Sequence, residues 1–378
     1  MEPLTILQAI RKELKSVLVE RDHLVDGVLL ALLARQHVLL LGPPGTAKSM
    51  LARELCRRLG GRYFEWLLTK FTTPEEIFGP LSLPALEQGR FERIIENKLP
   101  VADIAFLDEI FKANSAILNS LLTILNERRF YQGTQIMDVP VHSVIGASNE
   151  LPEEEELAAL YDRFALRFTA GYIENAGNFG RMLLMHDAGK APVTVLPRES
   201  LMTLAQACAA IAVPKAVIAE MAQLRQQLTT KGVIASDRRY RQSLSVLRAA
   251  ALLDGRQSVQ HQDLFWLEHM LWNDPSEQSA VLAVLSEMSS GFEEEARKLI
   301  RQALEIKAYA ARSWPTQAES DRALIEAHTK LEDIHRHLGT LQRRARERGR
   351  DAGPLEHHKQ RVADMQRELL VSARSWVS

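Results

Sequence analysis

The strongest constraint on the fold is a short stretch near the start of the chain, LLLGPPGTAKSML at residues 39–51. An apolar run leads into a loop rich in glycine and proline, and a helix-type pattern follows. The loop departs from the phosphate-binding pattern G-x-x-x-x-G-K-[ST] only at Ala47, which stands where the second glycine is expected. An alanine is tolerated there at little cost if its backbone is helical. Such a strand–loop–helix unit predicts an α/β fold with an anion site at the helix N-terminus.

The chemistry of a phosphate cradle assigns roles to this loop. Backbone N–H groups face the phosphates, a lysine reaches the β- and γ-phosphates, and a hydroxyl holds Mg²⁺. Lys48 and Ser49 supply the last two groups. The alternative is a chance match, which is disfavoured because strand, loop, lysine, serine and helix all occur in register. The predicted nucleotide-binding residues of the loop are Gly42, Pro43, Pro44, Gly45, Thr46, Ala47, Lys48, Ser49 and Met50.

Two further apolar runs end in polar residues suited to hydrolysis. DIAFLD at 103–108 ends in Asp108, which is expected to bind Mg²⁺ with the loop serine, and Glu109 is expected to polarise the attacking water. HSVIGAS at 142–148 is followed by Asn149. Because the carboxyl ends of parallel strands meet at one edge, Asn149 is expected beside Asp108, facing the γ-phosphate. Taken singly, the acid pair is also typical of a helix N-terminus and the asparagine of a turn.

The rest of the chain predicts a P-loop α/β core followed by helices. Residues 4–35 predict two amphipathic helices, and buried strands are predicted at 38–41, 63–67, 103–108 and 142–148, with a hairpin around Gln132-Gly133. Strands that alternate with helices indicate a parallel sheet covered on both faces. Helices fill 178–272, and three long ones follow within 292–376, as a bundle or hairpin. The predicted domains are an α/β nucleotide-binding domain at 1–177, an all-α lid at 178–275 and a long-helix module at 276–378.

Composition excludes several classes of protein. The 378 residues carry a formal net charge of −1, so no overall basic field favours nucleic acid as a partner. Apolar runs are too short to span a bilayer, and the N-terminus lacks the pattern of a signal peptide. The chain has 2 cysteines, which argues against a disulfide framework. A cytoplasmic protein without a membrane segment is therefore expected.

Seven motifs together resemble one family. GPPGTAKS, TPEEIFGP, FLDEIFKA, LNERRF, ASNELP, ALYDRFALR and SDRRY occur in the order and spacing of the MoxR family of AAA+ ATPases, over roughly residues 1–275. Within that family the chain most resembles the RavA branch, and alanine before the P-loop lysine is usual there. The resemblance implies an ATPase that uses ATP and Mg²⁺ and forms a ring, expected to be a hexamer. It also implies chaperone-like remodelling of a protein client with a von Willebrand factor A companion.

The chain departs from the RavA branch in one respect. The RavA branch carries a small β-rich insertion in its C-terminal helical region, and no strand pattern occurs here between 280 and 378. Partners gripped by that insertion are therefore not expected.

The same resemblance assigns roles to residues already singled out. Lys48 and Ser49 resemble the Walker A motif, Asp108 and Glu109 resemble Walker B, and Asn149 resembles sensor 1.

Two arginine positions complete the family pattern, each with an alternative. Arg163 resembles an arginine finger that reaches the ATP of a neighbouring subunit, and Arg167 is the other candidate. Arg238 resembles sensor 2 on the lid, with Arg239 as the less favoured choice. Arg163 and Arg167 could instead be salt-bridged surface residues near the acidic run 153–156. Arg238 and Arg239 could be a basic first helical turn after an Asp cap, and exposed pairs of this kind contribute little to stability. An arginine finger contributes about 10³-fold or more to the rate, so mutation separates the two interpretations.

Two other functions are consistent with a nucleotide site. A DNA-acting AAA+ motor would grip DNA with a basic hairpin, but here Arg128 and Arg129 lie only at the hairpin base and its tip is neutral. A nucleotide-gated structural adaptor with slow turnover would work through its C-terminal helices, and the intact Asp108-Glu109 pair argues against a dead site.

Overall fold

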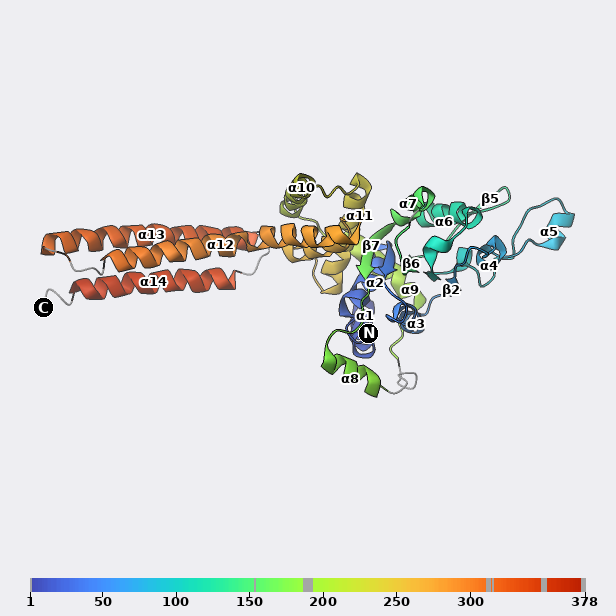
Figure 1. Cartoon of the computed structure of the whole chain (residues 1–378), viewed down its shortest axis with the longest axis horizontal. Coiled ribbons are helices and arrows are strands. Elements are labelled where there is room, and N and C mark those ends of the chain that lie inside the picture. The colour runs from blue at the N-terminus through green and yellow to red at the C-terminus, as the bar shows by residue number, and fades with distance from the viewer. Residues whose placement is uncertain are drawn as a thin grey trace. The chain divides into compact units, whose positions relative to one another are not determined.

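The computed structural model describes residues 2–152, 154–185, 193–310, 314, 316–347 and 352–374 (Figure 1). The chain divides into two compact units. Unit 1 comprises Met1–Val213, Ile234–Val259 and Trp266–Gln278, and unit 2 comprises Pro214–Val233, Gln260–Phe265 and Ser279–Ser378. The division into three domains drawn from the sequence has other boundaries and stays a prediction.

Unit 1 is built on a five-stranded parallel sheet in the order β2-β3-β6-β1-β7. The four strands predicted from apolar runs are confirmed. Every residue of β1 and β6 is buried, so helices cover both faces at the centre of the sheet. The strands are β1 (His37–Leu41), β2 (Tyr63–Leu67), β3 (Ile104–Asp108), β6 (Ser143–Ser148) and β7 (Phe164–Thr169).

The edge strand β7 was not predicted, and the reason is Arg167 in its middle. This arginine interrupts the apolar run, yet its side chain is 0% exposed. Its guanidinium donates hydrogen bonds to the backbone oxygens of Trp272 (2.6 Å) and Tyr161 (3.2 Å) and lies 3.9 Å from the centre of the Tyr161 ring. These contacts compensate the desolvation of a buried cation. A strand with such a residue cannot be recognised by hydrophobicity alone.

The two helices predicted within residues 4–35 are confirmed, but the second is not amphipathic. The second predicted amphipathic helix, α2, is instead buried from Leu24 to Ala34. Its one buried acid, Asp26, accepts hydrogen bonds from Arg11 and Lys15, each at 2.7 Å. The helices are α1 (Pro3–Val17), α2 (Asp22–Ala34), α3 (Lys48–Arg58), α4 (Pro74–Phe78), α5 (Leu83–Glu87), α6 (Ser115–Glu127), α7 (Glu155–Tyr161), α8 (Ala176–Leu184), α9 (Arg198–Ala210) and α11 (Asp237–Leu253).

Shorter elements complete unit 1. The predicted hairpin is confirmed as β4 (Arg129–Gln132) paired antiparallel with β5 (Gln135–Asp138). A 3₁₀ helix, η2 (Ile110–Lys112), follows the acid pair at the end of β3, and η1 (Leu99–Val101) precedes that strand. Two more, η4 (His261–His269) and η5 (Pro275–Glu277), lie in the last part of the unit, with the first half of η4 assigned to unit 2.

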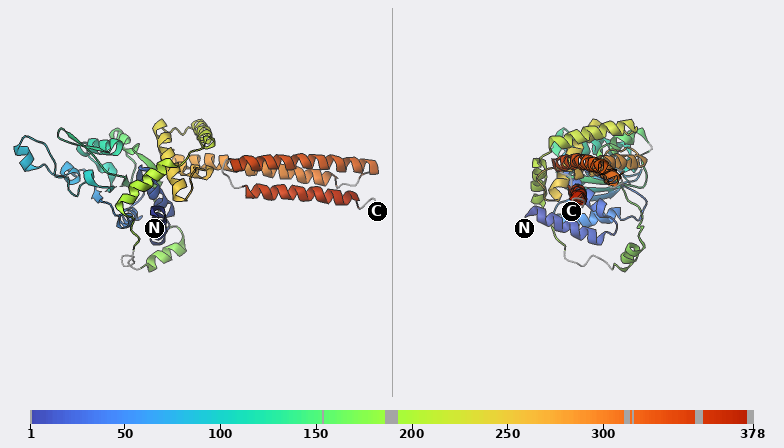
Figure 2. Two further views of the ribbon diagram at one scale, coloured as in Figure 1. Left: turned by 180° about the vertical axis from the view of Figure 1, so that it is seen from behind. Right: turned by 90° about the vertical axis from the view of Figure 1, so that its left-hand side faces the viewer.

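Unit 2 contains the three long helices expected at the end of the chain. α12 (Gln278–Ala310) begins earlier than predicted, and α13 (Gln317–Glu347) and α14 (Gly353–Arg374) follow, with α10 (Lys215–Thr230) also in this unit. Figures 1 and 2 show the three long helices running side by side. One apolar core joins them, with Ala296, Leu338 and Val362 fully buried. Of the helices in the described ranges, none is long and apolar enough to cross a membrane.

Candidate nucleotide-binding site

The loop between β1 and α3 has the backbone that a phosphate cradle needs. Gly42 has φ +150°, and a Cβ atom there would lie 2.2 Å from the backbone oxygen of Ala170. Gly45 has φ +79° and open space around it. A side chain at the first position would clash and at the second would be strained, so both positions favour glycine.

An alanine at position 47 was expected to cost little stability if its backbone were helical, but the backbone of Ala47 is not helical. Its backbone is left-handed, with φ 67° and ψ 21°, at the N-cap of α3. An alanine in this conformation is strained because its Cβ approaches the following carbonyl oxygen. The backbone at position 47 therefore has the conformation that favours the glycine of the pattern, although the residue is alanine.

Lys48 is buried at the start of α3 and is held by the loop itself. Its ammonium donates to the backbone oxygens of Gly42 (2.6 Å) and Pro43 (3.0 Å) and to Oδ1 of Asn149 (3.2 Å). Burial lowers the pKa of Lys48, and attraction to Asp108 and Glu109 opposes the shift. The amine is thus fixed over the loop where phosphate oxygens would lie.

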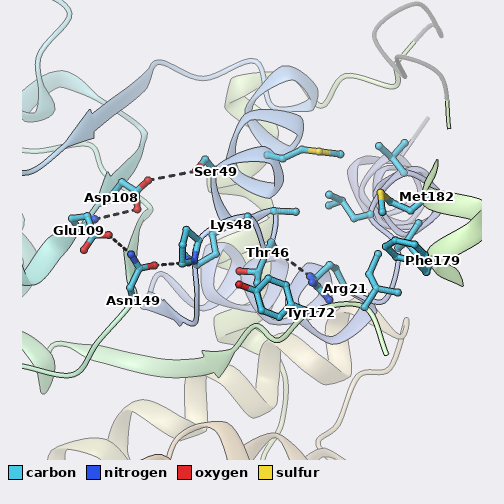
Figure 3. Close-up of a pocket in the computed structure, with 18 residues that line it drawn as sticks. Arg21, Thr46, Lys48, Ser49, Asp108, Glu109, Asn149, Tyr172, Phe179 and Met182 are labelled. Carbon is cyan, nitrogen blue, oxygen red and sulfur yellow. Dashed lines mark hydrogen bonds between the residues drawn. The ribbon is translucent and has the colours of Figure 1, made fainter. Parts of the chain in front are cut away.

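The carboxyl ends of β3 and β6 bring the predicted catalytic groups together, as Figure 3 shows. Ser49 Oγ donates to Asp108 Oδ2 at 3.5 Å, and the backbone N–H of Glu109 donates to Asp108 Oδ1 at 3.1 Å. Asn149 Nδ2 donates to Glu109 Oε1 at 2.6 Å. Glu109 itself has a left-handed φ of 52°. Lys48, Asn149 and Glu109 therefore form one chain of polar contacts next to the Ser49–Asp108 pair.

A hydroxyl and a carboxylate are ligands that Mg²⁺ accepts, with phosphate oxygens and water completing its shell. Ser49 and Asp108 fit that role. Among the described residues, no group of three or more His, Cys, Asp or Glu side chains could hold a metal ion without other ligands.

The loop opens into a cavity of about 760 Å³, a size that accepts a nucleotide. One end is polar and includes Lys48, Asp108 and Asn149. The other end is apolar and comes from three separate segments, the end of α1 and its connection, the chain after β7, and α8. Its apolar lining consists of Val17, Leu18, Val19, Tyr172, Ile173, Phe179 and Met182. Sequence reasoning missed these residues, because no spacing rule joins segments so far apart.

Arg21 is a further lining residue that the sequence did not reveal. Its side chain is buried, and its guanidinium donates to the backbone oxygens of Thr46 (3.1 Å), Glu20 (2.8 Å) and Gly171 (2.6 Å). Burial lowers the pKa of Arg21. It ties the phosphate loop to the chain after β7, and an isolated arginine after a helix gives no signal of such a role.

The four arginines considered from the sequence lie elsewhere in unit 1. Arg163 (3.6 Å), Arg238 (3.7 Å) and Arg239 (2.8 Å) all approach the carboxylate of Asp162. Arg239 is buried and also donates to the backbone oxygen of Trp272, whereas the side chain of Arg238 is 52% exposed. Arg167 is buried in β7.

None of these arginines is among the described residues that line the cavity. The structure therefore brings together Lys48, Ser49, Asp108, Glu109 and Asn149, and it groups Arg163 with Arg238 at a second place.

A parallel sheet with a phosphate loop after one strand and an acid pair after another defines the class of P-loop nucleotide-binding proteins. Comparison with known proteins narrows the class. A family model described as the MoxR domain in the MoxR-vWA-beta-propeller ternary systems matches residues 5–188, and one described as an AAA lid domain matches residues 216–285. The chain belongs to the MoxR family of AAA+ ATPases.

Individual proteins are also similar to this chain. The uncharacterized protein MJ0812 of Methanocaldococcus jannaschii is 39% identical over 288 residues, which cover 76% of this chain and 77% of that protein. Chaperone MoxR1 of Mycobacterium tuberculosis is 31% identical over 164 residues, covering 42% and 43% of the two chains. A solved ATPase candidate from Cytophaga hutchinsonii superposes with a TM-score of 0.62 over 75% of this chain and 94% of its own, at 15% identity, which speaks for the fold alone.

Proposed function

We propose that the chain binds ATP with Mg²⁺ and hydrolyses it. The observation that carries the proposal is the chain of contacts from Lys48 through Asn149 to Glu109, beside the Ser49–Asp108 pair, at the mouth of one cavity. Lys48 would bind the β- and γ-phosphates, and Ser49 with Asp108 would hold Mg²⁺. When bound, the ion neutralises charge on the phosphate oxygens.

Glu109 is the residue we assign to the attacking water. Its left-handed backbone and the hydrogen bond from Asn149 fix the carboxylate at the end of β3. Such a carboxylate can accept a proton from water or orient it for attack. Asn149, which contacts both Glu109 and Lys48, would contact the γ-phosphate and the water.

The test of hydrolysis is Glu109→Gln, with Glu150→Gln as a control because Glu150 is exposed and pairs with Lys112 close to the site. We expect the first variant to lose hydrolysis by on the order of 10²–10³-fold while its Kd for ATP stays unchanged. The control should match the wild type in both measurements. Unchanged turnover in Glu109→Gln would overturn the assignment.

We propose further that the active form is a ring, expected to be a hexamer, in which Arg163 contacts the nucleotide of a neighbouring subunit and Arg238 acts as sensor 2. The support for Arg163 is its position at Asp162, apart from the cavity of its own chain. Arg238 approaches the same carboxylate, and its role rests on the sequence motif. A shared site requires assembly, so specific activity should rise with protein concentration in the presence of ATP and Mg²⁺.

Mixing two inactive variants gives a sharper test. In a mixture of Arg163→Ala and Glu109→Gln, some interfaces combine an intact Arg163 from one subunit with an intact Glu109 from the other. Arg163→Ala alone should lose about 10³-fold or more in rate. Glu109→Gln alone should lose on the order of 10²–10³-fold, and the mixture should recover activity. A mixture as inactive as its parts would contradict action between subunits.

The work done with ATP is proposed to be chaperone-like remodelling of a protein client, together with a von Willebrand factor A companion. The description of the family model that matches residues 5–188 supports the companion, and the name of the mycobacterial relative supports the chaperone role. Placement in the RavA branch rests on the sequence motifs alone. A change in ATP turnover on addition of a von Willebrand factor A protein would test the partnership.

Action on DNA is not favoured by the hairpin. Arg128 turns inward and donates to the backbone oxygens of Val141 and Arg35, and Arg129 lies near Asp138 at 4.0 Å. The turn between β4 and β5 is neutral. ATP turnover that stays flat when DNA is added at low salt is the expected result. Release of no phosphate in a single turnover would instead favour the structural adaptor.

A further inference from the structure

The connection between α1 and α2 carries two adjacent charged residues that contact different parts of the cavity. Glu20 has a left-handed backbone with φ 56°, and Arg21 follows it directly before α2. Strained non-glycine residues of this kind persist where surrounding contacts hold them. The contacts of these two side chains indicate what holds them here.

Arg21 connects two backbone segments that border the cavity. All three of its hydrogen bonds among the described residues go to backbone oxygens, including Thr46 in the phosphate loop and Gly171 after β7. A planar guanidinium can serve several acceptors at once, which an ammonium cannot match in geometry. Arg21 thus adds a side-chain connection between the phosphate loop and the chain after β7, beside the backbone hydrogen bond that Ala170 donates to Leu41 (2.7 Å).

Glu20 holds the start of α8. Its carboxylate accepts hydrogen bonds from the backbone N–H of Glu174 (2.9 Å) and Asn175 (3.1 Å) and from Nδ2 of Asn178 (2.9 Å). A carboxylate near the first N–H groups of a helix is favourable both as an acceptor and through the helix dipole. Asn175 is the N-cap of α8 and also accepts the N–H of Asn178.

α8 needs such an anchor because packing does not provide one. Every residue from Ala176 to Leu184 is at least partly exposed, although the helix places Phe179 and Met182 in the lining of the cavity. In Figure 3 these two side chains lie on the side away from Asp108 and Glu109, with Arg21 between the two ends. The apolar end is where the base and ribose of a nucleotide would lie when its phosphates occupy the loop.

We propose that Glu20 and Arg21 are positioning residues for the nucleoside part of the ligand. Glu20 holds α8, and with it Phe179 and Met182, against the base, and Arg21 fixes that wall relative to the phosphate loop. The inference rests on the proposed binding of ATP. It predicts that a change at Glu20 weakens binding at the apolar end of the cavity and leaves binding at the phosphate loop intact.

The experiment compares two ligands in the full chain. ADP occupies both ends of the cavity, whereas tripolyphosphate has no base and occupies only the loop. Kd values with Mg²⁺ are measured by calorimetry for the wild type, Glu20→Gln and Glu174→Gln. The last variant is the matched control, because Glu174 is exposed and contributes its backbone N–H, not its side chain, to the contact with Glu20.

We expect Glu20→Gln to weaken ADP about tenfold and tripolyphosphate less than twofold, since the amide keeps one acceptor oxygen and loses the charge. KM for ATP should rise by a similar factor while kcat is retained. Hydrogen exchange should show that ADP protects α8 in the wild type and less so in the variant. Arg21→Lys should weaken both ligands, because it also releases the phosphate loop.

Equal weakening of ADP and tripolyphosphate by Glu20→Gln would overturn the inference, since it would mean a general loss of the site. Equal behaviour of Glu20→Gln and Glu174→Gln would overturn it as well. A wild-type chain that binds neither ligand would instead refute the proposed function, so the two failures are distinguishable.

Discussion

Replacement of Ala47 by glycine should stabilise this protein, although glycine usually destabilises. The backbone of Ala47 is left-handed, at φ 67°, and this conformation costs an L-residue about 1–2 kcal/mol. Glycine removes that cost but loses more backbone entropy on folding, by about 0.5–1 kcal/mol. The difference predicts that Ala47→Gly raises the free energy of unfolding by about 0.5–1 kcal/mol, with ATP binding retained.

A matched control tests whether the effect of glycine depends on the left-handed backbone. Ala207 is exposed within helix α9, where the same substitution should lower the free energy of unfolding by about 1 kcal/mol. Urea unfolding of the wild type and both variants, followed by circular dichroism, measures the two effects. The reasoning would be refuted if Ala47→Gly lowered the unfolding midpoint as much as Ala207→Gly does, because the loop alanine would then not be strained.

Two further predictions concern buried groups of the sheet. His37 is held neutral between the backbone oxygen of Leu125 and the N–H of Val144, and burial lowers its pKa to about 3, below the ordinary 6.5 of the unfolded chain. The stability that neutral His37 contributes is complete above pH 6.5 and is lost as pH falls toward 3. Urea titrations should therefore show a loss of stability between pH 7 and pH 5, to which His37 contributes on the order of 2 kcal/mol; a flat profile would contradict this. Arg167→Met should lower the free energy of unfolding by about 3 kcal/mol or more, because the buried carbonyls of Trp272 and Tyr161 lose their donor, whereas the same change at exposed Arg241 should have little effect.

The polar half of the site could be predicted because its residues follow strands. Asp108 ends one apolar run, Asn149 directly follows another, and Lys48 follows the loop after a third. Parallel strands bring their carboxyl ends to one edge of the sheet. The structure brings these residues together as expected. Arg163 and Arg238 could be named from the family pattern, but the pattern did not show that both approach Asp162.

The apolar half could not be predicted, because it is assembled from segments without a common spacing. Phe179 and Met182 come from an exposed helix whose position depends on the carboxylate of Glu20, more than 150 residues away in the chain. Hydrophobic periodicity describes which face of a helix is apolar, not which distant residue anchors that helix.

The amino-acid sequence by itself determined four of the five strands, the phosphate loop and the acid pair, since these follow from local patterns of apolar runs, glycine and charge. It also determined the three long helices, whose apolar stripes require mutual burial. Only the tertiary structure decided that Ala47 is left-handed, that Arg167 is buried in a fifth strand, and that Glu20 and Arg21 join the two ends of the cavity. These features depend on hydrogen bonds between distant backbone groups, and the sequence does not specify such partners locally.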